Sequence, residues 1–230
     1  MCVCPHFLIP HGRAEQQFLS ARQRNVSMWV IGHIPPGGST SQPQSLSVHK
    51  FSAWYQRMMV EFSDVLSFHL YGHSHFNELR LFSVDDEGEN STGVVYVSPA
   101  ATPWEKQNPS FRIFEMEDEA PFRPLDYHQY YADIENQPTN GDPLPWQHLY
   151  SAKQEYNLTD LSPSSWNNLL AKMWSNRTLF QQYYENWKSK CPKGKCNSDE
   201  CIKHMICAQR HISLKKIYEC QFGILNGKRA

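Results

Sequence analysis

Two apolar runs, each followed by glycine and histidine, set the main constraint on this fold. Residues 28–31 precede a Gly-His pair that ends at His33, and residues 65–70 precede a Tyr-Gly-His-Ser-His turn that contains His73 and His75. Short apolar runs bounded by glycine are typical of buried strands. Imidazole is the commonest protein ligand of zinc and similar metals. The pattern therefore predicts a metal site on loops at one edge of a sheet, with a structural role for the three histidines as the alternative.

The other histidines lack this context, and we interpret them as surface or packing residues. They are His6, His11, His49, His69, His128, His148, His204 and His211. A site for two metal ions also needs carboxylates, which offset the charge and bridge the ions. No acidic motif of this kind precedes His33. The Asp-Tyr-His sequence at 126–128 and the Gly-Asp pair at 141–142 come after both histidine turns, so we interpret them as coincidence.

Composition limits the classes of function. The 230-residue chain is 40% hydrophobic and has a formal net charge of −1. The apolar fraction is enough for a packed core, and the small charge implies no surface for a nucleic-acid polymer. No apolar run approaches the roughly 18 residues of a membrane-spanning helix. The first residues lack the basic start and the apolar length of a signal peptide.

Cysteines concentrate near the C-terminus, where five of the seven fall in the last 40 residues. They are Cys191, Cys196, Cys201, Cys207 and Cys220. Their spacing fits no standard zinc module, which favours a disulfide framework over a zinc knuckle. Four glycosylation sequons begin at Asn25, Asn90, Asn157 and Asn176. These signals favour a secretory compartment, and because no signal peptide is recognisable, we expect the chain to lack the N-terminal part of its protein.

Periodicity predicts the order of the elements. Apolar residues recur every three or four positions between residues 47 and 62, which predicts a helix. The other expected helices span 13–24, 145–156, 163–174, 176–189, 199–209 and 213–222. Strands are expected at 27–31, 65–70, 79–84, 94–98, 111–116 and 125–130, with loops at 37–46, 85–90 and 99–109.

A change in composition divides the chain. We expect a leader of unknown role at 1–12, a strand-rich part at 13–120, a linker with one strand at 121–144 and a helical part at 145–230. The predicted fold class is therefore α/β (α+β).

Several motifs together resemble one family. A Gly-His-x-Pro-Pro-Gly sequence beginning at residue 32, followed by Gly-His-x-His beginning at residue 72, resembles the second half of the calcineurin-like metallophosphoesterases. The acid sphingomyelinase and acid sphingomyelinase-like phosphodiesterase branch is the most similar. Further similar stretches are 98–104 (Ser-Pro-Ala-Ala-Thr-Pro-Trp), 108–112 (Asn-Pro-Ser-Phe-Arg), 146–150 (Trp-Gln-His-Leu-Tyr), 156–159 (Tyr-Asn-Leu-Thr) and the cysteine pattern of 196–220. The resemblance covers about residues 13–222.

The resemblance implies part of a metallophosphoesterase β-sandwich, ending near residue 120, and then a helical, disulfide-bonded C-terminal domain. It implies a site for two zinc ions, with His33 and His73 as ligands of one ion and His75 as a ligand of the other. The family's carboxylate ligands and proton-donating histidines lie in motifs before the first of these histidines, and this chain has none of them. At most one weakly held zinc ion is therefore expected here.

Two further roles follow from the resemblance. Trp104 is expected to line the substrate cleft, although a role as a buried loop anchor is an equal alternative. The cysteine pattern implies disulfides Cys196–Cys201 and Cys207–Cys220. It assigns no partners to Cys2, Cys4 and Cys191.

The resemblance predicts a zinc-dependent phosphodiesterase for sphingomyelin-like or nucleotide phosphodiesters, secreted or lysosomal, and weakly active or inactive in this form. The catalytic groups are expected upstream of this chain. The alternative is a non-catalytic secreted glycoprotein fragment, or an inactive isoform, that works by binding a partner. In either case we expect apolar strands to be exposed on an open side of the sheet.

Overall fold

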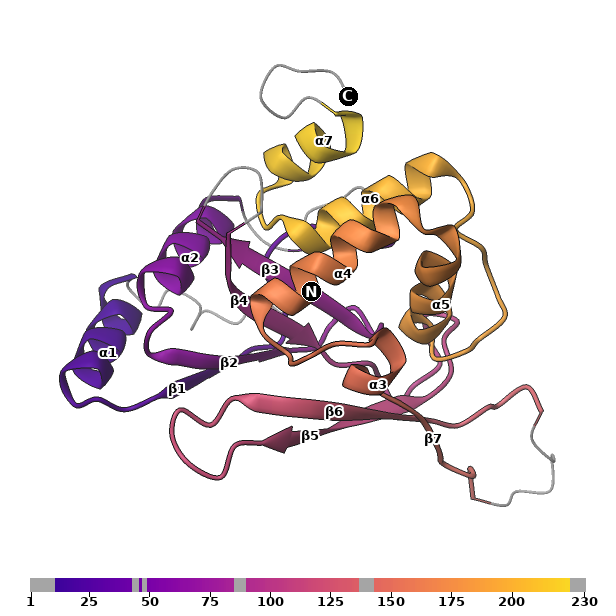
Figure 1. The fold of residues 1–230 in the computed structure, drawn as a ribbon, viewed down its shortest axis with the longest axis horizontal. Helices are drawn as coiled ribbons and strands as arrows, with labels where there is room; N and C mark the ends of the chain where they lie inside the picture. The colour runs from indigo at the N-terminus through magenta and orange to yellow at the C-terminus, as the bar shows by residue number, and fades with distance from the viewer. Residues whose placement is uncertain (1–10, 43–45, 47–48, 85–89, 137–142, 224–230) are drawn as a thin grey trace.

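The computed structural model describes residues 11–42, 46, 49–84, 90–136 and 143–223 (Figure 1). Most of the predicted leader at 1–12 and of the predicted loop at 85–90 lies outside these residues, as do Cys2 and Cys4. The described chain has two sheets and a helical C-terminal part. This is the mixed α/β class that the sequence predicts.

The first sheet has four strands in the order β1-β2-β4-β3. They are β1 (Met28–Ile31), β2 (Leu66–Tyr71), β3 (Glu78–Ser83) and β4 (Ser91–Val97). The strands β1, β2 and β4 run parallel, and β3 pairs antiparallel with β4. Because β1 and β2 are parallel neighbours, the two histidine turns that follow them leave the sheet at the same edge.

Two helices, α1 (His11–Gln23) and α2 (His49–Glu61), pack on one face of this sheet (Figure 1). Phe18 of α1 and Met59 of α2 are buried in the same apolar cluster as Phe82 and Val95 of the sheet. The apolar face of α2 that the sequence predicts is therefore a core face.

The second sheet is antiparallel and has the order β5-β6-β7. Its strands are β5 (Ser110–Met116), β6 (Pro124–Tyr131) and β7 (Gln147–Ser151). The strand expected near 125–130 is confirmed, and it is the central strand of this sheet. The helix predicted over 145–156 is wrong for most of its length, because these residues form β7 and only the short helix α3 (Ala152–Tyr156) follows.

The C-terminal part consists of α4 (Pro163–Ser175), α5 (Arg177–Trp187), α6 (Asp199–Arg210) and α7 (Leu214–Phe222). Three of these helices start at a polar residue whose side chain accepts a hydrogen bond from a backbone amide of the first turn. These residues are Ser162, Asn176 and Ser198. Such N-caps satisfy amides that have no partner within the helix, which explains where the helices begin.

Trp166 of α4 connects the helical part to both sheets. The indole N–H donates to the Tyr96 hydroxyl of β4 at 3.1 Å, and the indole ring stacks on Tyr127 of β6 at 6.2 Å between centroids. All three side chains belong to one buried cluster. The sheets and the C-terminal helices therefore share a continuous core.

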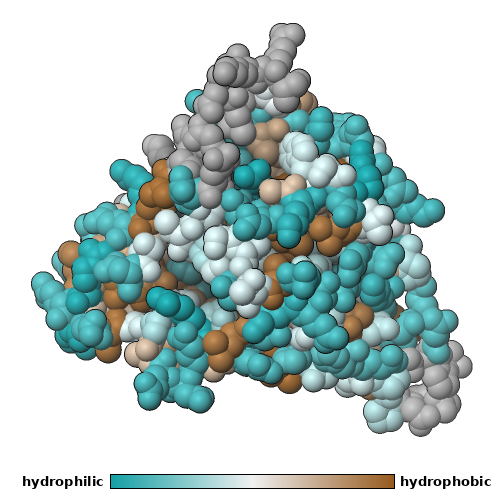
Figure 2. Space-filling model, in the orientation of Figure 1, coloured by the Kyte–Doolittle hydropathy of each residue, from teal (hydrophilic) through white to brown (hydrophobic). Residues whose placement is uncertain are grey.

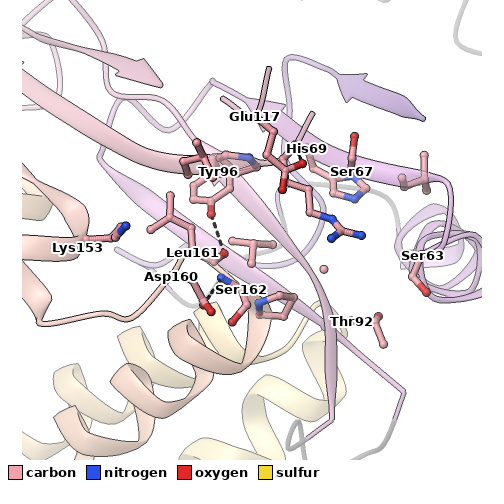
Figure 3. A pocket seen from close by; sticks show the side chains of 17 residues that line it. Ser63, Ser67, His69, Thr92, Tyr96, Glu117, Lys153, Asp160, Leu161 and Ser162 are labelled. Atoms are coloured by element: carbon pink, nitrogen blue, oxygen red, sulfur yellow. Dashed lines mark hydrogen bonds between the residues drawn. The ribbon is translucent and has the colours of Figure 1, made fainter. Parts of the chain in front are cut away.

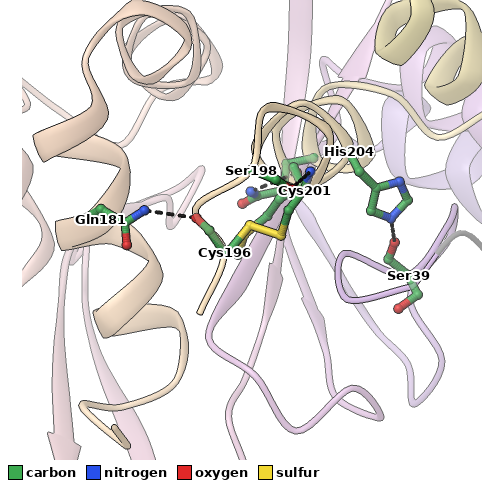
Figure 4. Close-up of a disulfide and its surroundings, with 8 residues drawn as sticks. Ser39, Gln181, Cys196, Ser198, Cys201 and His204 are labelled. Carbon is green, nitrogen blue, oxygen red and sulfur yellow. Dashed lines mark hydrogen bonds between the residues drawn. A yellow bond between two sulfur atoms is a disulfide. The ribbon is translucent and has the colours of Figure 1, made fainter. Parts of the chain in front are cut away.

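Both disulfides that the resemblance implies are present, Cys196–Cys201 and Cys207–Cys220. The first lies at the N-terminal end of α6 (Figure 4), and the second joins α6 to α7. Cys191 is buried and forms no disulfide with another described cysteine.

Apolar side chains remain exposed along β1, whose outer edge has no partner strand among the described residues. Trp29 is 46% exposed and Ile31 is 70% exposed.

The face seen in Figure 2 is largely hydrophilic, with separate hydrophobic patches. No helix in the described part of the chain has the length and apolar character needed to cross a bilayer.

Candidate functional site

The two histidine turns lie side by side at the edge of the first sheet. The Gly32 amide donates to the carbonyl of Leu70, and the Gly72 amide donates to the carbonyl of His33, both at 3.0 Å. These bonds continue the β1–β2 ladder beyond the ends of the strands. The backbone therefore places the residue after Gly32 directly beside the residue after Gly72.

His33 and His73 are in contact. His33 Nε2 lies 3.3 Å from His73 Nδ1, and the ring centroids are 5.1 Å apart. Both rings are at the surface. Two imidazoles from turns forty residues apart thus converge on one point, as the sequence predicts for these two residues.

The Gly-His-Ser-His turn has an uncommon backbone. His73 has φ of 74° and His75 has φ of 68°, which is the left-handed region that side chains other than glycine seldom adopt. Such conformations cost of the order of 1 kcal/mol each and cluster at functional sites. His75 Nδ1 is buried and has no hydrogen-bond partner among the described residues.

The environment of His73 favours the neutral imidazole. Partial burial lowers its pKa, and the charges of His33 and His75 lower it further, whereas Glu78 acts in the opposite direction. A neutral imidazole has a free lone pair and is the form that binds metals.

These residues do not complete a zinc site by themselves. Zinc takes four ligands, and a two-metal site needs carboxylates. Within the described ranges, no group of three or more histidine, cysteine, aspartate or glutamate side chains is placed to hold a metal ion. Glu78 is near His73, but its carboxylate is already bound by Arg80 and Thr40.

Sequence reasoning missed Glu78 and Arg80. Their side chains form an ion pair of 2.8 Å with exposed fractions of 1% and 0%. Arg80 also donates to the carbonyl of Gly38, in the segment that follows His33. The signal that could have revealed them is a pair of opposite charges two positions apart among apolar residues. Side chains at this spacing lie on the same face of a strand and can bind each other.

A second pair of histidines lies on the three-stranded sheet. His128 Nδ1 is 3.3 Å from His148 Nε2, and His128 Nε2 is 2.7 Å from a carboxylate oxygen of Glu115. Both nitrogens of His128 are thus engaged by neighbouring side chains. We take these histidines as competitors to be controlled for in any metal titration.

Trp104 is exposed. Its exposed fraction is 80%, in the loop between β4 and β5, so it is not a buried anchor of that loop. The loop is held instead by Gln107, whose amide donates to the Thr102 carbonyl at 2.7 Å. The indole is therefore free to contact a ligand.

The four sequon asparagines, Asn25, Asn90, Asn157 and Asn176, are all exposed. Each of these side chains is therefore accessible for the attachment of a glycan. Glycosylation at these positions stays a prediction.

A cavity of about 440 Å³ lies apart from the histidine turns (Figure 3). It is lined by Ser67 and His69 of β2, by residues of β4 and by the loop that precedes α4, and it includes none of the three candidate histidines. Burial lowers the pKa of His69 to about 4. The imidazole at this cavity is therefore uncharged near neutral pH.

Comparison with known proteins gives consistent matches. A family model described as the acid sphingomyelin phosphodiesterase C-terminal region matches residues 90–222. Sphingomyelin phosphodiesterase A of Dictyostelium discoideum is 32% identical over 204 residues, covering 89% of this chain and 33% of that protein. Sphingomyelin phosphodiesterase of Homo sapiens is 26% identical over 196 residues, covering 83% and 29%. Acid sphingomyelinase-like phosphodiesterase 3b of Mus musculus is 27% identical over 217 residues, covering 90% and 46%. The chain thus spans between 29% and 46% of the length of these relatives.

Proposed function

This chain belongs to the acid sphingomyelinase family, and on that premise we propose that it works in zinc-dependent hydrolysis of a phosphodiester. The observation that carries the proposal is the contact of His33 with His73 at one sheet edge. The substrate class is a sphingomyelin-like lipid or a nucleotide phosphodiester. The exposed indole of Trp104 supports a role for this residue in contacting the substrate.

We assign His33, His73 and His75 as zinc ligands. Support comes from the contact between the rings of His33 and His73. The left-handed backbone of the turn that carries His73 and His75 supports it as well. Among the described residues no group of three or more histidine, cysteine, aspartate or glutamate side chains could hold a metal ion, and the Glu78 carboxylate is bound by Arg80. For the 230-residue chain by itself we therefore propose weak binding of a single zinc ion and little turnover.

A secretory or lysosomal location fits this function. Both disulfides need an oxidising compartment to form, and all four sequons are exposed. Mass spectrometry of the chain secreted by a eukaryotic host would show whether glycans are attached.

Calorimetric titration with zinc tests the metal assignment. We expect His73→Ala to weaken zinc binding at least about tenfold, a loss of about 1.4 kcal/mol or more. The matched control is His148→Ala, which removes the β7 member of the competing pair formed with His128 of β6 and should leave the main binding event unchanged. Loss of binding in the control, with retention in His73→Ala, would place the metal at the wrong pair and reject the assignment.

A chromogenic phosphodiester assay with added zinc tests the activity. Turnover that disappears in His73→Ala supports the enzyme. No turnover in a folded chain would favour a second candidate function, partner binding without catalysis. The exposed apolar residues of β1 favour that alternative, since an open strand edge can pair with another chain.

A further inference from the structure

The segment that directly follows His33 is fixed in place. His33 and Ile34 are at the surface, but every residue from Pro35 to Thr40 is buried. Two consecutive prolines restrict the first part of this segment. The position of His33 therefore depends on what holds residues 37–40.

One anchor is the ion pair on β3. Arg80 donates to the carbonyl of Gly38, and Glu78 accepts a hydrogen bond from the Thr40 hydroxyl at 2.6 Å. Gly37 has φ of 99°, and a Cβ there would lie 3.2 Å from the Arg80 guanidinium. The backbone thus runs close to the ion pair, and the positive φ at this position favours glycine.

This ion pair is also close in sequence to the second histidine turn. The strand β3 begins at Glu78, three residues after His75. The buried ion pair therefore contacts the segment that follows the first histidine turn. It also lies in the strand that directly follows the second histidine turn.

The other anchor comes from the C-terminal helices. His204 of α6 is buried, and its Nε2 lies 3.0 Å from the carbonyl oxygen of Ser39 (Figure 4). A carbonyl can only accept, so Nε2 must carry the proton. His204 is three residues from Cys201 and three from Cys207, each of which is in a disulfide. The donor is therefore held by a helix that is cross-linked on both sides of it.

We propose that His204 and Arg80 are positioning residues that hold His33 against His73 by clamping the segment from Gly37 to Thr40. This rests on the proposed role of the histidine pair in metal binding. The disulfide-bonded C-terminal part then has a function at the sheet edge that carries His33 and His73, because its α6 supplies one of the two clamps.

The test compares variants of His204 in the full chain. His204→Leu removes the donor, whereas His204→Gln retains an N–H at a comparable distance along the side chain. We expect the leucine variant to speed amide exchange between residues 37 and 41 at least about tenfold, to shift the imidazole NMR signal of His33 and to weaken zinc binding. The glutamine variant should restore all three measurements toward the native values. His148→Leu, on β7 of the second sheet, is the matched control.

Thr40→Val provides an independent test, because it removes the bond to Glu78 with little change in volume and without touching α6. It should also shift the His33 signal. Unchanged exchange and an unchanged His33 signal in both His204→Leu and Thr40→Val would overturn the proposal. A shifted His33 signal in a chain that never binds zinc would support the clamp while rejecting the metal assignment, so the two failures can be told apart.

Discussion

The burial of His69 makes the stability of this protein depend on pH in a defined window. The side chain is 3% exposed, packs 5.2 Å from the ring of Phe82, and has a buried Nδ1 with no hydrogen-bond partner among the described residues. Burial lowers its pKa from 6.5 to about 4. Removing a charged imidazole from water is costly, so the folded state keeps the ring neutral.

The sign and size follow from proton linkage. Between about pH 6.5 and about pH 4 the unfolded chain binds a proton at this histidine and the folded chain does not. The free energy of unfolding therefore falls as the pH is lowered through this window and is highest above it. A shift of this size corresponds to about 3 kcal/mol in full, of which about 2 kcal/mol is lost by about pH 4.5.

Urea unfolding at about pH 7 and about pH 4.5 measures the effect. His69→Gln and His69→Leu remove the titrating group, so each variant should lose about 2 kcal/mol less than the native chain on acidification. Other groups titrate in the native chain and in the variants alike, so their contributions cancel in the difference between the two losses. His148→Gln, at an exposed position, is the control and should keep most of the native pH dependence. Equal pH dependence in the native chain and both His69 variants would refute the argument.

Two further predictions concern the disulfides and the exposed loop. Replacing Cys207 and Cys220 by serine opens a loop with a sequence separation of 13, against 5 for Cys196 and Cys201. The losses in unfolding free energy should be about 3 and about 2 kcal/mol respectively, measured in urea, and the reverse order would argue against loop closure as the cause. Trp104→Ala should change stability by less than about 0.5 kcal/mol because the indole is exposed, yet weaken the binding of a phosphodiester ligand about tenfold by fluorescence titration. A clear fall in the melting temperature would instead show that the indole supports its loop.

The approach of His33 to His73 could be expected from sequence because it depends on local rules. Each histidine follows a glycine at the end of an apolar run, and parallel neighbouring strands end at one edge of a sheet. Strand β7 was not predictable in the same way. Leu149 and Tyr150 are adjacent apolar residues that suit a helix or a strand, and pairing with β6, which is a tertiary interaction, decides between them.

The environment of Glu78 and Arg80 was beyond sequence reasoning for a different reason. Residues 78–81 alternate charged and apolar side chains, which is typical of a strand with one face in water. All six residues of β3 are buried instead. The segment after His33 binds the two charged side chains, and α6 packs against the same strand, and both come from distant parts of the chain.

The open side of β1 has a practical consequence for work on this chain. Its side chains Trp29 and Ile31 are exposed, and the backbone groups along its outer edge are not paired with any described strand. Two molecules in solution can join along such a row into one longer sheet. Protein concentration then becomes an experimental variable, and sedimentation over a dilution series should accompany each titration.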